Sequence, residues 1–353
     1  MQYIKLSPAH ISGKEINYIE EAISRGEISN YGKNLDAFKK QLENFFSEKS
    51  KIALLNSGTA AIHLALIHLG VKRGDEVICQ SFTFSASVNP IVYQGAKPIF
   101  VDSEPETWNI CPYNLEKSIK TRISKGKTPK AIIIVYSYGM PAKMDEINAI
   151  ASKYNIPIIE DAAEALGSSY KGEKCGTFGK FGVISFNGNK IITTSGGGAL
   201  ICKTKKLKEK TVFLSTQARD NAAHYEHSKI GYNYSMTNID AGIGRAQMEF
   251  LEQHIALRRN MNTFYQALFK SVGGVEVFKE PNSKFVSNHW LSCILIDPKE
   301  TGFTNNALRL ELFKHNIEAK LLWKPMHLQP IFKHNTFFGT QKSDSLFKKG
   351  LSL

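Results

Sequence analysis

The chain has 353 residues, 42% of them hydrophobic, and its 45 Lys and Arg against 32 Asp and Glu give a net charge of +13. This length favours one large domain with a smaller one, and the composition is that of a globular protein. No run of about 18 apolar residues is present and the N-terminus lacks the apolar region of a secretory signal, so we expect a cytoplasmic protein without a membrane span. Five cysteines without a CxxC pair indicate reduced thiols, not a disulfide framework or a zinc site.

The positive charge suits nucleic acid, a membrane surface or a phosphorylated metabolite. It is spread along the sequence, and its densest run, Lys203 to Lys210, indicates the start of a solvated surface helix. Because the sequence has no zinc-finger spacing and no RNA-binding aromatic signature, we predict no nucleic-acid partner. We also predict no metal site, since His63 and His68 would lie on different helix faces and no carboxylate accompanies them in sequence.

Two amphipathic helices are predicted at the start of the chain. Ser12-Gly13-Lys14-Glu15 matches a capping box, and Ile16, Ile19 and Ile23 then repeat at helical spacing until Gly26 ends the pattern. A second helix carries apolar residues at positions 35, 38, 42 and 45.

From residue 51 onward, short apolar strands alternate with helices. The expected strands are 52–55, 76–79, 98–101, 131–135, 156–159, 183–186 and 199–202, and the expected helices are 60–69, 85–93, 113–123 and 144–154. This alternation predicts an α/β fold with a mainly parallel sheet that is covered on both faces. Such sheets bind ligands at the carboxyl ends of their strands, so Ser57-Gly58-Thr59, Asp161 and Lys190 would meet at one edge.

The pattern changes after Gly244. A long helical stretch at 239–269 is followed by strands at 275–278, 289–296 and 317–322 and by a helix at 305–315. We therefore predict a large domain over residues 1–244 and a smaller α+β domain over residues 245–353.

Lys190 follows the strand at 183–186 and precedes Gly196-Gly197-Gly198. Glycines let a backbone approach a ligand closely, and a lysine beside them is placed to act as a nucleophilic amine that forms Schiff bases. By itself a lysine is more often a solvated surface residue.

Three other stretches carry two interpretations each. Ser57-Gly58-Thr59 lies where a strand turns into a helix, and it is interpreted either as an anion site or as a simple helix cap. Asp161 ends a strand, where its carboxylate would hold the ring nitrogen of pyridoxal phosphate protonated or would cap a helix. Phe84 follows another strand, as a ring that stacks on a flat cofactor or as a core residue.

The order of these groups is that of a fold-type I pyridoxal phosphate enzyme, and the sequence resembles the DegT/DnrJ/StrS family of sugar-nucleotide aminotransferases from about Ile4 to its end. The resemblance is carried, in the family's order, by NSGTAAIHLAL (56–66), GDEVICQSFTFSASVNPI (74–91), IIEDAAEALGS (159–169), SFNGNKIITTSGGGA (185–199), NYSMTNIDAGIGRAQ (233–247) and KPMHLQPIF (324–332).

The resemblance implies an aspartate aminotransferase-like fold, pyridoxal phosphate as cofactor and Lys190 as the Schiff-base lysine. It implies that Asp161 holds the pyridine nitrogen and that Phe84 stacks on the ring. Other cofactor positions fall on Gly58, Thr59, Ser185 and Glu164, the last where many members have Gln or His. Asn238 matches the asparagine that reaches the phosphate of a neighbouring subunit, which implies a homodimer with shared sites.

Substrate contacts are implied less directly. Ser29, Asn30 and Tyr31 match an N-terminal substrate loop, and Arg219 and His327 match polar positions near the sugar and the diphosphate. Lys320 stands where many members carry Arg; it keeps the charge and loses the planar fork that grips phosphate by two bonds.

The Asn187-Gly188-Asn189-Lys190 motif resembles the lysine motif of one subgroup of the family. That subgroup aminates UDP-4-keto-6-deoxy-N-acetylglucosamine with L-glutamate, for surface polysaccharide or glycan synthesis. Amination of a C3-keto or dTDP-linked sugar, and a non-catalytic cofactor-binding regulator, remain alternatives. Family members continue past residues 350–353 through a turn and a final helix, so we expect exposed apolar partners in the smaller domain.

Overall fold

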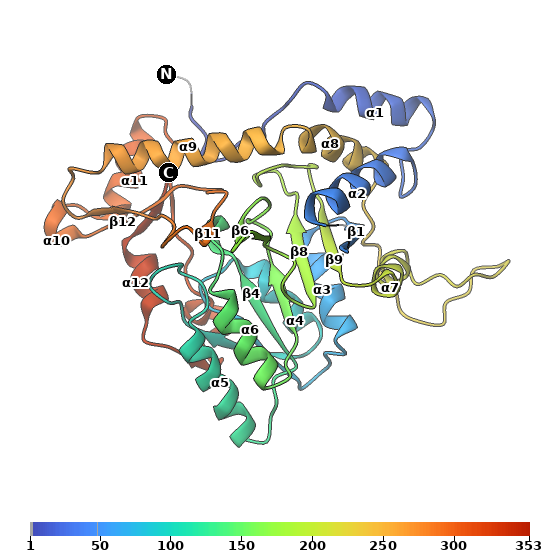
Figure 1. Cartoon of the computed structure of the whole chain (residues 1–353), viewed down its shortest axis with the longest axis horizontal. Helices are drawn as coiled ribbons and strands as arrows, with labels where there is room; N and C mark the ends of the chain where they lie inside the picture. The colour runs from blue at the N-terminus through green and yellow to red at the C-terminus, as the bar shows by residue number, and fades with distance from the viewer. Residues whose placement is uncertain (1–2, 48) are drawn as a thin grey trace.

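The computed structural model describes residues 3–47 and 49–353 (Figure 1). A central eight-stranded sheet dominates the molecule. In sheet order its strands are β1 (Lys51–Leu55), β9 (Gly198–Cys202), β8 (Phe181–Ser185), β5 (Ile158–Asp161), β4 (Ala131–Val135), β2 (Glu76–Gln80), β3 (Lys97–Val101) and β14 (Phe337–Phe338). Neighbours are parallel except at β9, which runs antiparallel to both β1 and β8. The predicted α/β fold with a mainly parallel sheet is confirmed.

Both faces of this sheet are buried, and successive side chains on a strand enter the two cores in turn because they point to opposite sides. On β4, Ile132 and Ile134 belong to one core, and Ala131, Ile133 and Val135 belong to the other. The first core takes side chains from α2 (Lys33–Phe46), α5 (Pro112–Ser124), α6 (Met144–Lys153) and α8 (Asn238–Met248). The second takes them from α3 (Gly58–His68), α4 (Asn89–Tyr93) and α7 (Lys205–Ser215).

The C-terminal part builds a second, antiparallel sheet. Its order is β10 (Val275–Val277), β12 (Cys293–Ile296), β15 (Gly350–Ser352) and β13 (Lys320–Leu321), with α9 (Leu251–Leu268), α10 (Pro298–Thr301), α11 (Asn305–Lys314) and α12 (Lys342–Lys349) around it. A third small sheet joins β11 (Phe285–Val286), β6 (Ser169–Tyr170) and β7 (Glu173–Lys174). Although β14 lies after Gly244 in the sequence, it pairs with β3 and so belongs to the central sheet. The two-domain boundary at this residue stays a prediction.

The long helical stretch expected at 239–269 is two helices, α8 and α9, which end and begin around Glu249 and Phe250. The amide of Glu249 bonds to Ala246 O at 3.2 Å and that of Phe250 to Gln247 O at 3.1 Å, the tighter i−3 pattern of a helix end. The apolar periodicity continues through this break, which is why the sequence pattern did not reveal it.

Two absences hold for the described residues. Within 3–47 and 49–353, every helix is too short or too polar to cross a bilayer. Nowhere in the same ranges do three or more His, Cys, Asp or Glu side chains gather closely enough to hold a metal ion.

Only the glutamate half of the expected capping box forms at α1 (Glu15–Ser24). The Glu15 carboxylate accepts 2.9 Å bonds from the amides of Ser12 and Gly13, whereas the Ser12 hydroxyl accepts from the amide of Lys14. Gln247 Nε2 of α8 also donates to Glu15 at 2.6 Å. Burial opposes ionisation, but these hydrogen bonds outweigh it and lower the pKa of Glu15 from its ordinary 4.5 to about 2.

The Glu15→Gln variant is therefore expected to be less stable than the wild type at pH 7 by about 1–2 kcal/mol, after allowance for solvent screening. Because folding lowers the pKa of Glu15, the ionised carboxylate stabilises the folded protein fully above pH 4.5, the ordinary pKa of the group. This contribution disappears as the pH falls toward about 2. Urea unfolding at several pH values checks this expectation: the difference between the two proteins should shrink between pH 4.5 and 2. A difference that does not change with pH would contradict it.

Gly198, at the start of β9, lets this strand pass close to the beginning of α3. A Cβ at this position would lie 2.4 Å from the carbonyl carbon of Ser57 and 2.5 Å from the amide nitrogen of Gly58. We expect Gly198→Ala to lower the free energy of unfolding by about 2 kcal/mol or more, as overpacking does. Gly273→Ala is the matched control, because nothing lies within 4 Å of its added methyl. Equal midpoints of urea unfolding for the two variants would refute the close packing.

Candidate active site

A cavity of about 530 Å³ opens at the carboxyl edge of the central sheet. Seven strands of this sheet, all except β9, run in one direction and end at this edge, and the loops after five of them contribute to the wall. The contributions after β1, β2, β4, β5 and β8 are Ser57, Thr83, Tyr138, Glu164 and Asn187 respectively. The antiparallel sheet of the C-terminal part contributes Lys320 of β13 and Ser352 of β15 to the wall, and Glu318 just before β13 adds to it. The expectation that ligand-binding groups meet at the strand ends agrees with this arrangement.

Lys190 projects into this cavity from the loop between β8 and β9. Its Nζ lies 3.1 Å from Glu164 Oε1 and 4.4 Å from the centre of the Trp290 ring, and its side chain is 12% exposed. The loop is held by a bond from the Lys190 amide to Asn187 O and by one from Trp290 Nε1 to Asn189 O. The amine therefore points into a protein-lined pocket and away from bulk water.

Glu164 is the acidic neighbour of this amine. Burial raises the pKa of its carboxyl to about 7, although the Lys190 charge and the amide of Tyr138, which donates to Oε2 at 2.9 Å, act in the opposite direction. Tyr138 itself has a left-handed backbone with φ of 56° in the turn η2 (Ser137–Gly139), and this conformation turns its amide toward the carboxyl.

Asp161 is the last residue of β5 and is almost completely buried. Its Oδ2 accepts a 2.6 Å bond from Ser87 Oγ, and its Oδ1 accepts one of 3.1 Å from the amide of Ala163. Burial raises the pKa of this carboxyl, while the two hydrogen bonds and the charge of Lys190 favour its ionised form. The carboxylate is thus fixed in position and lies within electrostatic reach of the lysine.

The N-terminus of α3 forms a third part of the wall. Ser57 caps the helix by accepting a 3.1 Å bond from the amide of Ala60, so the simple cap interpretation holds for this residue. The helix end still faces the cavity through Gly58 and Thr59, whose first-turn amides have no intrahelical acceptor. A Cβ on Gly58 would approach Ser185 Cβ to 3.2 Å, so the glycine keeps this corner open.

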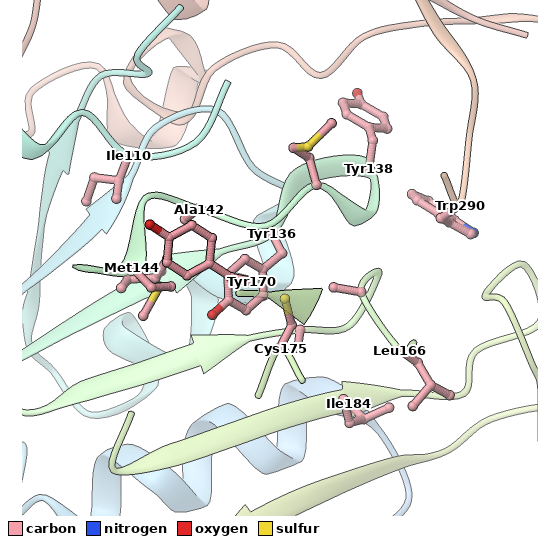
Figure 2. Close-up of a cluster of buried hydrophobic side chains, with 14 of the residues drawn as sticks. Ile110, Tyr136, Tyr138, Ala142, Met144, Leu166, Tyr170, Cys175, Ile184 and Trp290 are labelled. Atoms are coloured by element: carbon pink, nitrogen blue, oxygen red, sulfur yellow. The ribbon is translucent and has the colours of Figure 1, made fainter. Parts of the chain in front are cut away.

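Aromatic rings cover the remaining walls. Phe84 lines the cavity and is 58% exposed, which places it at the site and outside the core. Tyr138 stacks on Trp323 with ring centres 4.4 Å apart, and the Trp290 ring lies nearly parallel to Tyr138 at 6.3 Å. Figure 2 shows Tyr138 and Trp290 facing each other from separate chain segments.

The comparison with known families decides the identity of this arrangement. Residues 9–353 match the model of the DegT/DnrJ/EryC1/StrS aminotransferase family. The chain belongs to this family. The enzyme class and the cofactor that the sequence predicted, an aminotransferase that depends on pyridoxal phosphate, are confirmed at the level of the family.

Three relatives of the family match almost the whole chain. EpsN of Bacillus subtilis (strain 168), a candidate pyridoxal phosphate-dependent aminotransferase, is 47% identical over 99% of this chain and 90% of its own length. The GDP-perosamine synthase of Escherichia coli O157:H7 is 38% identical over 94% and 88%. The UDP-4-amino-4,6-dideoxy-N-acetyl-beta-L-altrosamine transaminase of Campylobacter jejuni subsp. jejuni serotype O:23/36 (strain 81-176) is 32% identical over 99% and 92%.

Solved structures of the family share the fold. An aminotransferase from Brucella abortus superposes with a TM-score of 0.90 at 28% identity, covering 97% of this chain and 90% of its own. The sugar aminotransferase candidate Spr1654 of Streptococcus pneumoniae, in its PLP form, has a TM-score of 0.90 at 25% identity over 100% and 93%.

The cavity fits the family's cofactor in the chemistry of its donor groups. It offers an amine for the aldehyde, a fixed buried carboxylate for the ring nitrogen and a helix N-terminus for the phosphate. The open corner at Gly58 leaves this helix end accessible to an anion.

Eight of the residues singled out from the sequence line this cavity, and six do not. Those in the wall are Gly58, Thr59, Phe84, Asp161, Glu164, Ser185, Lys190 and Lys320. Lys320 pairs with Glu318 at 3.1 Å.

Asn238 and the loop of Ser29, Asn30 and Tyr31 form a separate cluster. Asn238 receives a 3.1 Å bond from the amide of Leu35, donates from Nδ2 to Glu27 O at 2.6 Å, and bonds through its own amide to Ser29 O. Ser29 bonds to Asn30 and Asn238, the Tyr31 hydroxyl donates to Gly26 O at 3.3 Å, and none of the four residues lines the cavity of its own chain. Their roles toward the cofactor and substrate stay predictions.

Arg219 and His327 also lie outside the cavity wall. Arg219 stacks on Tyr225 in the segment between α7 and α8, which extends away from the body of the molecule in Figure 1. His327 is enclosed: Nδ1 lies 2.7 Å from Ser81 Oγ and Nε2 lies 3.1 Å from Asp344 Oδ1. Burial lowers the pKa of His327, although the charges of Asp344 and Asp102 act against this.

Sequence reasoning missed Ser87, Tyr138, Trp290 and Trp323 as site residues. Ser87 lies within the 74–91 motif, and its spacing from Phe84 on the turn after β2 could have suggested it. The other three come from segments without a marked motif, and only the folded chain brings them to Lys190 and Glu164.

Proposed function

We propose that this protein transfers the amino group of L-glutamate to C4 of a UDP-4-keto-6-deoxy-N-acetylhexosamine and so produces a UDP-4-amino sugar. The observation that carries the proposal is the meeting of Lys190 Nζ, the Asp161 carboxylate and the α3 N-terminus in one cavity of about 530 Å³. The size and the open side of this cavity suit a cofactor together with part of a sugar nucleotide.

Pyridoxal phosphate, when bound, supplies an electron sink that makes the Cα–H bond of the donor amino acid acidic. In our proposal Lys190 binds the cofactor through Nζ, and the same amine later moves the proton at the donor Cα. Asp161 would hold the ring nitrogen protonated through its negative charge, and Ser87 and the Ala163 amide fix the position of this carboxylate. Gly58, Thr59 and Ser185 would hold the phosphate, and Phe84 would stack on the ring.

The exclusion of water supports this assignment. Lys190 is 12% exposed and its carboxylate neighbour Glu164 is 5% exposed, so the reacting amine works in a medium of low polarity. Trp290, Trp323 and Tyr138 form an apolar wall on this side. Lys320 adds a positive charge at the opposite wall, where it would face an anionic group of the substrate or of glutamate.

Two lines support the UDP-linked substrate. The Asn187-Gly188-Asn189-Lys190 motif is similar to the subgroup that aminates such sugars, and the Campylobacter relative carries a UDP-linked 4-amino-4,6-dideoxy sugar in its name. A GDP-linked keto sugar is the second candidate, because the GDP-perosamine synthase is more similar at 38% identity than the UDP-sugar enzyme at 32%.

A screen of keto-sugar nucleotides tests the substrate. The protein, loaded with pyridoxal phosphate, is incubated with L-glutamate and UDP-, GDP- or dTDP-linked keto sugars, and mass spectrometry follows the amine-for-ketone exchange. We expect the UDP-4-keto-6-deoxy-N-acetylhexosamine to be aminated at least tenfold faster than the others. Preference for the GDP-linked sugar would favour the second candidate, and no product with any sugar nucleotide would contradict the assigned reaction.

We also propose a homodimer in which each subunit completes the site of its partner. The cluster of Asn238 with Ser29, Asn30 and Tyr31 supports this, because it carries predicted ligand-binding groups outside its own cavity. Mixing Lys190→Ala and Asn238→Asp protomers tests it: hybrid dimers should regain activity, since one site per dimer combines an intact Lys190 with an intact Asn238. Hybrids as inactive as either parent would contradict sharing.

We propose a cytoplasmic location. All five cysteines are free thiols and four of them are buried, which suits a reducing compartment. Cell fractionation with an antibody to the protein would check this.

A further inference from the structure

Glu164 is held against Lys190 by a rigid frame. Its Oε1 accepts the 3.1 Å bond from Nζ, and its Oε2 accepts the 2.9 Å bond from the Tyr138 amide. Asn288 Nδ2 donates to the backbone carbonyls of Glu164 and Leu166 at 2.8 and 2.9 Å and so fixes the chain at and just after Glu164. The carboxyl group cannot turn away from Nζ without also losing the bond from the Tyr138 amide.

The groups that face Glu164 leave it with a simple electrostatic environment. They are Lys190, Asp161, Tyr138 and Cys293. Burial holds the pKa of the Tyr138 phenol and that of the Cys293 thiol well above their ordinary ranges, so both are neutral at pH 7. Besides Lys190, Asp161 is the charged member of this group, and its negative charge raises the pKa of Glu164.

We propose that Glu164 is the group that accepts the proton of the Lys190 ammonium and thereby releases the reactive free amine. In this step an N–H bond of Nζ breaks, its electron pair stays on the nitrogen, and an O–H bond forms at Oε1. The pair has no net charge before or after the transfer, so the cavity gains no unpaired buried charge. The inference rests on the proposed role of Lys190 as the amine that binds pyridoxal phosphate.

This arrangement has a measurable consequence for the dependence of the amine on pH. Above the carboxyl pKa of about 7 the pair holds a single proton, and transfer within it exchanges none with solvent, so the fraction of free amine stays constant at mildly alkaline pH. A lysine without such a partner must give its proton to water, and its free amine then rises about tenfold per pH unit. A residue that only orients the lysine would leave that rise in place.

The test follows bond formation between Lys190 and pyridoxal phosphate in the cofactor-free protein, by stopped-flow absorbance from about pH 8 to pH 9.5, between the carboxyl pKa of about 7 and the ordinary lysine pKa. The wild-type rate is expected to be nearly flat. The rate of Glu164→Gln is expected to rise with pH, so that the ratio of wild type to variant falls by about tenfold per pH unit. Glu318→Gln, which removes another carboxylate from the cavity wall, is expected to keep the flat profile.

Other outcomes are equally decisive. A ratio of wild type to Glu164→Gln that is the same at every pH would overturn the proposal and leave Glu164 as an orienting residue. If Glu164→Gln lacks the circular dichroism of the folded protein, the pH profile of the wild-type rate decides. A wild-type rate that rises about tenfold per pH unit would contradict a proton acceptor inside the cavity. Glu164→Asp is expected to keep the flat profile at a lower rate. A wild-type protein that forms no bond with pyridoxal phosphate at any pH would overturn the proposed function itself.

Discussion

Replacement of Lys190 with alanine is expected to lower the rate of transamination by about 10²- to 10⁴-fold, the range for loss of a group that moves a proton in the reaction. Among the residues that line the cavity, Lys320 is the other lysine, and its Nζ is engaged by Glu318 at 3.1 Å on the far wall. It is therefore badly placed to substitute. The glutamate half-reaction, followed by stopped-flow absorbance, measures the loss.

The absorption spectrum of the Lys190→Ala protein supplies an independent readout. The band of lysine-bound cofactor should be absent, while free pyridoxal phosphate can still bind through the remaining groups. Lys180→Ala is the matched control, because Lys180 is an exposed lysine just before β8 and lies outside the cavity wall. A Lys190→Ala protein with the wild-type spectrum would remove the central residue from the assignment.

Asp161→Asn is expected to slow the glutamate half-reaction by on the order of 10³-fold while the fold is retained. The amide has nearly the same shape, so the bond from the Ala163 amide can persist. It carries no negative charge, however, and so cannot keep the ring nitrogen protonated. Rapid-mixing kinetics with saturating glutamate would show the change in the first-order rate constant.

Ser87→Ala provides the graded comparison for this carboxylate. It removes the 2.6 Å bond to Asp161 Oδ2 and leaves the charge in place, so we expect a loss of roughly tenfold. If Asp161→Asn is no slower than Ser87→Ala, the charge of Asp161 has no part in the reaction and its role is limited to the geometry of the loop after β5.

Most of the predicted strands correspond to observed ones within two or three residues, because the strands of a buried parallel sheet are nearly continuous apolar runs. The strand at 131–135 was located without error, whereas that at 156–159 lies two residues later, at Ile158–Asp161. Predictions were weaker where elements are short: the run at 317–322 contains only the two-residue strand Lys320–Leu321, whose position depends on its partner β15.

The candidate site could be predicted in part for a similar reason. Asp161 ends an apolar strand, and Gly58 and Lys190 lie in the segments that follow two others, so strand order and the strand-end rule bring them together. Trp290 and Trp323 stand at no such position. Their place beside Lys190 and Tyr138 depends on how the C-terminal antiparallel sheet packs against the central sheet, which local periodicity does not encode.

The sequence by itself determined the sheet, the chemical types of the groups at its edge and the family to which they point, because these depend on periodicity and on motifs that lie within short stretches. Only the tertiary structure decided which groups touch. Glu164 became the partner of the lysine because a left-handed turn at Tyr138 and the side chain of Asn288 orient it, and both contacts join segments far apart in the chain. The burial that raises its pKa is likewise a property of the folded chain, since water is excluded only after the two sheets have packed together.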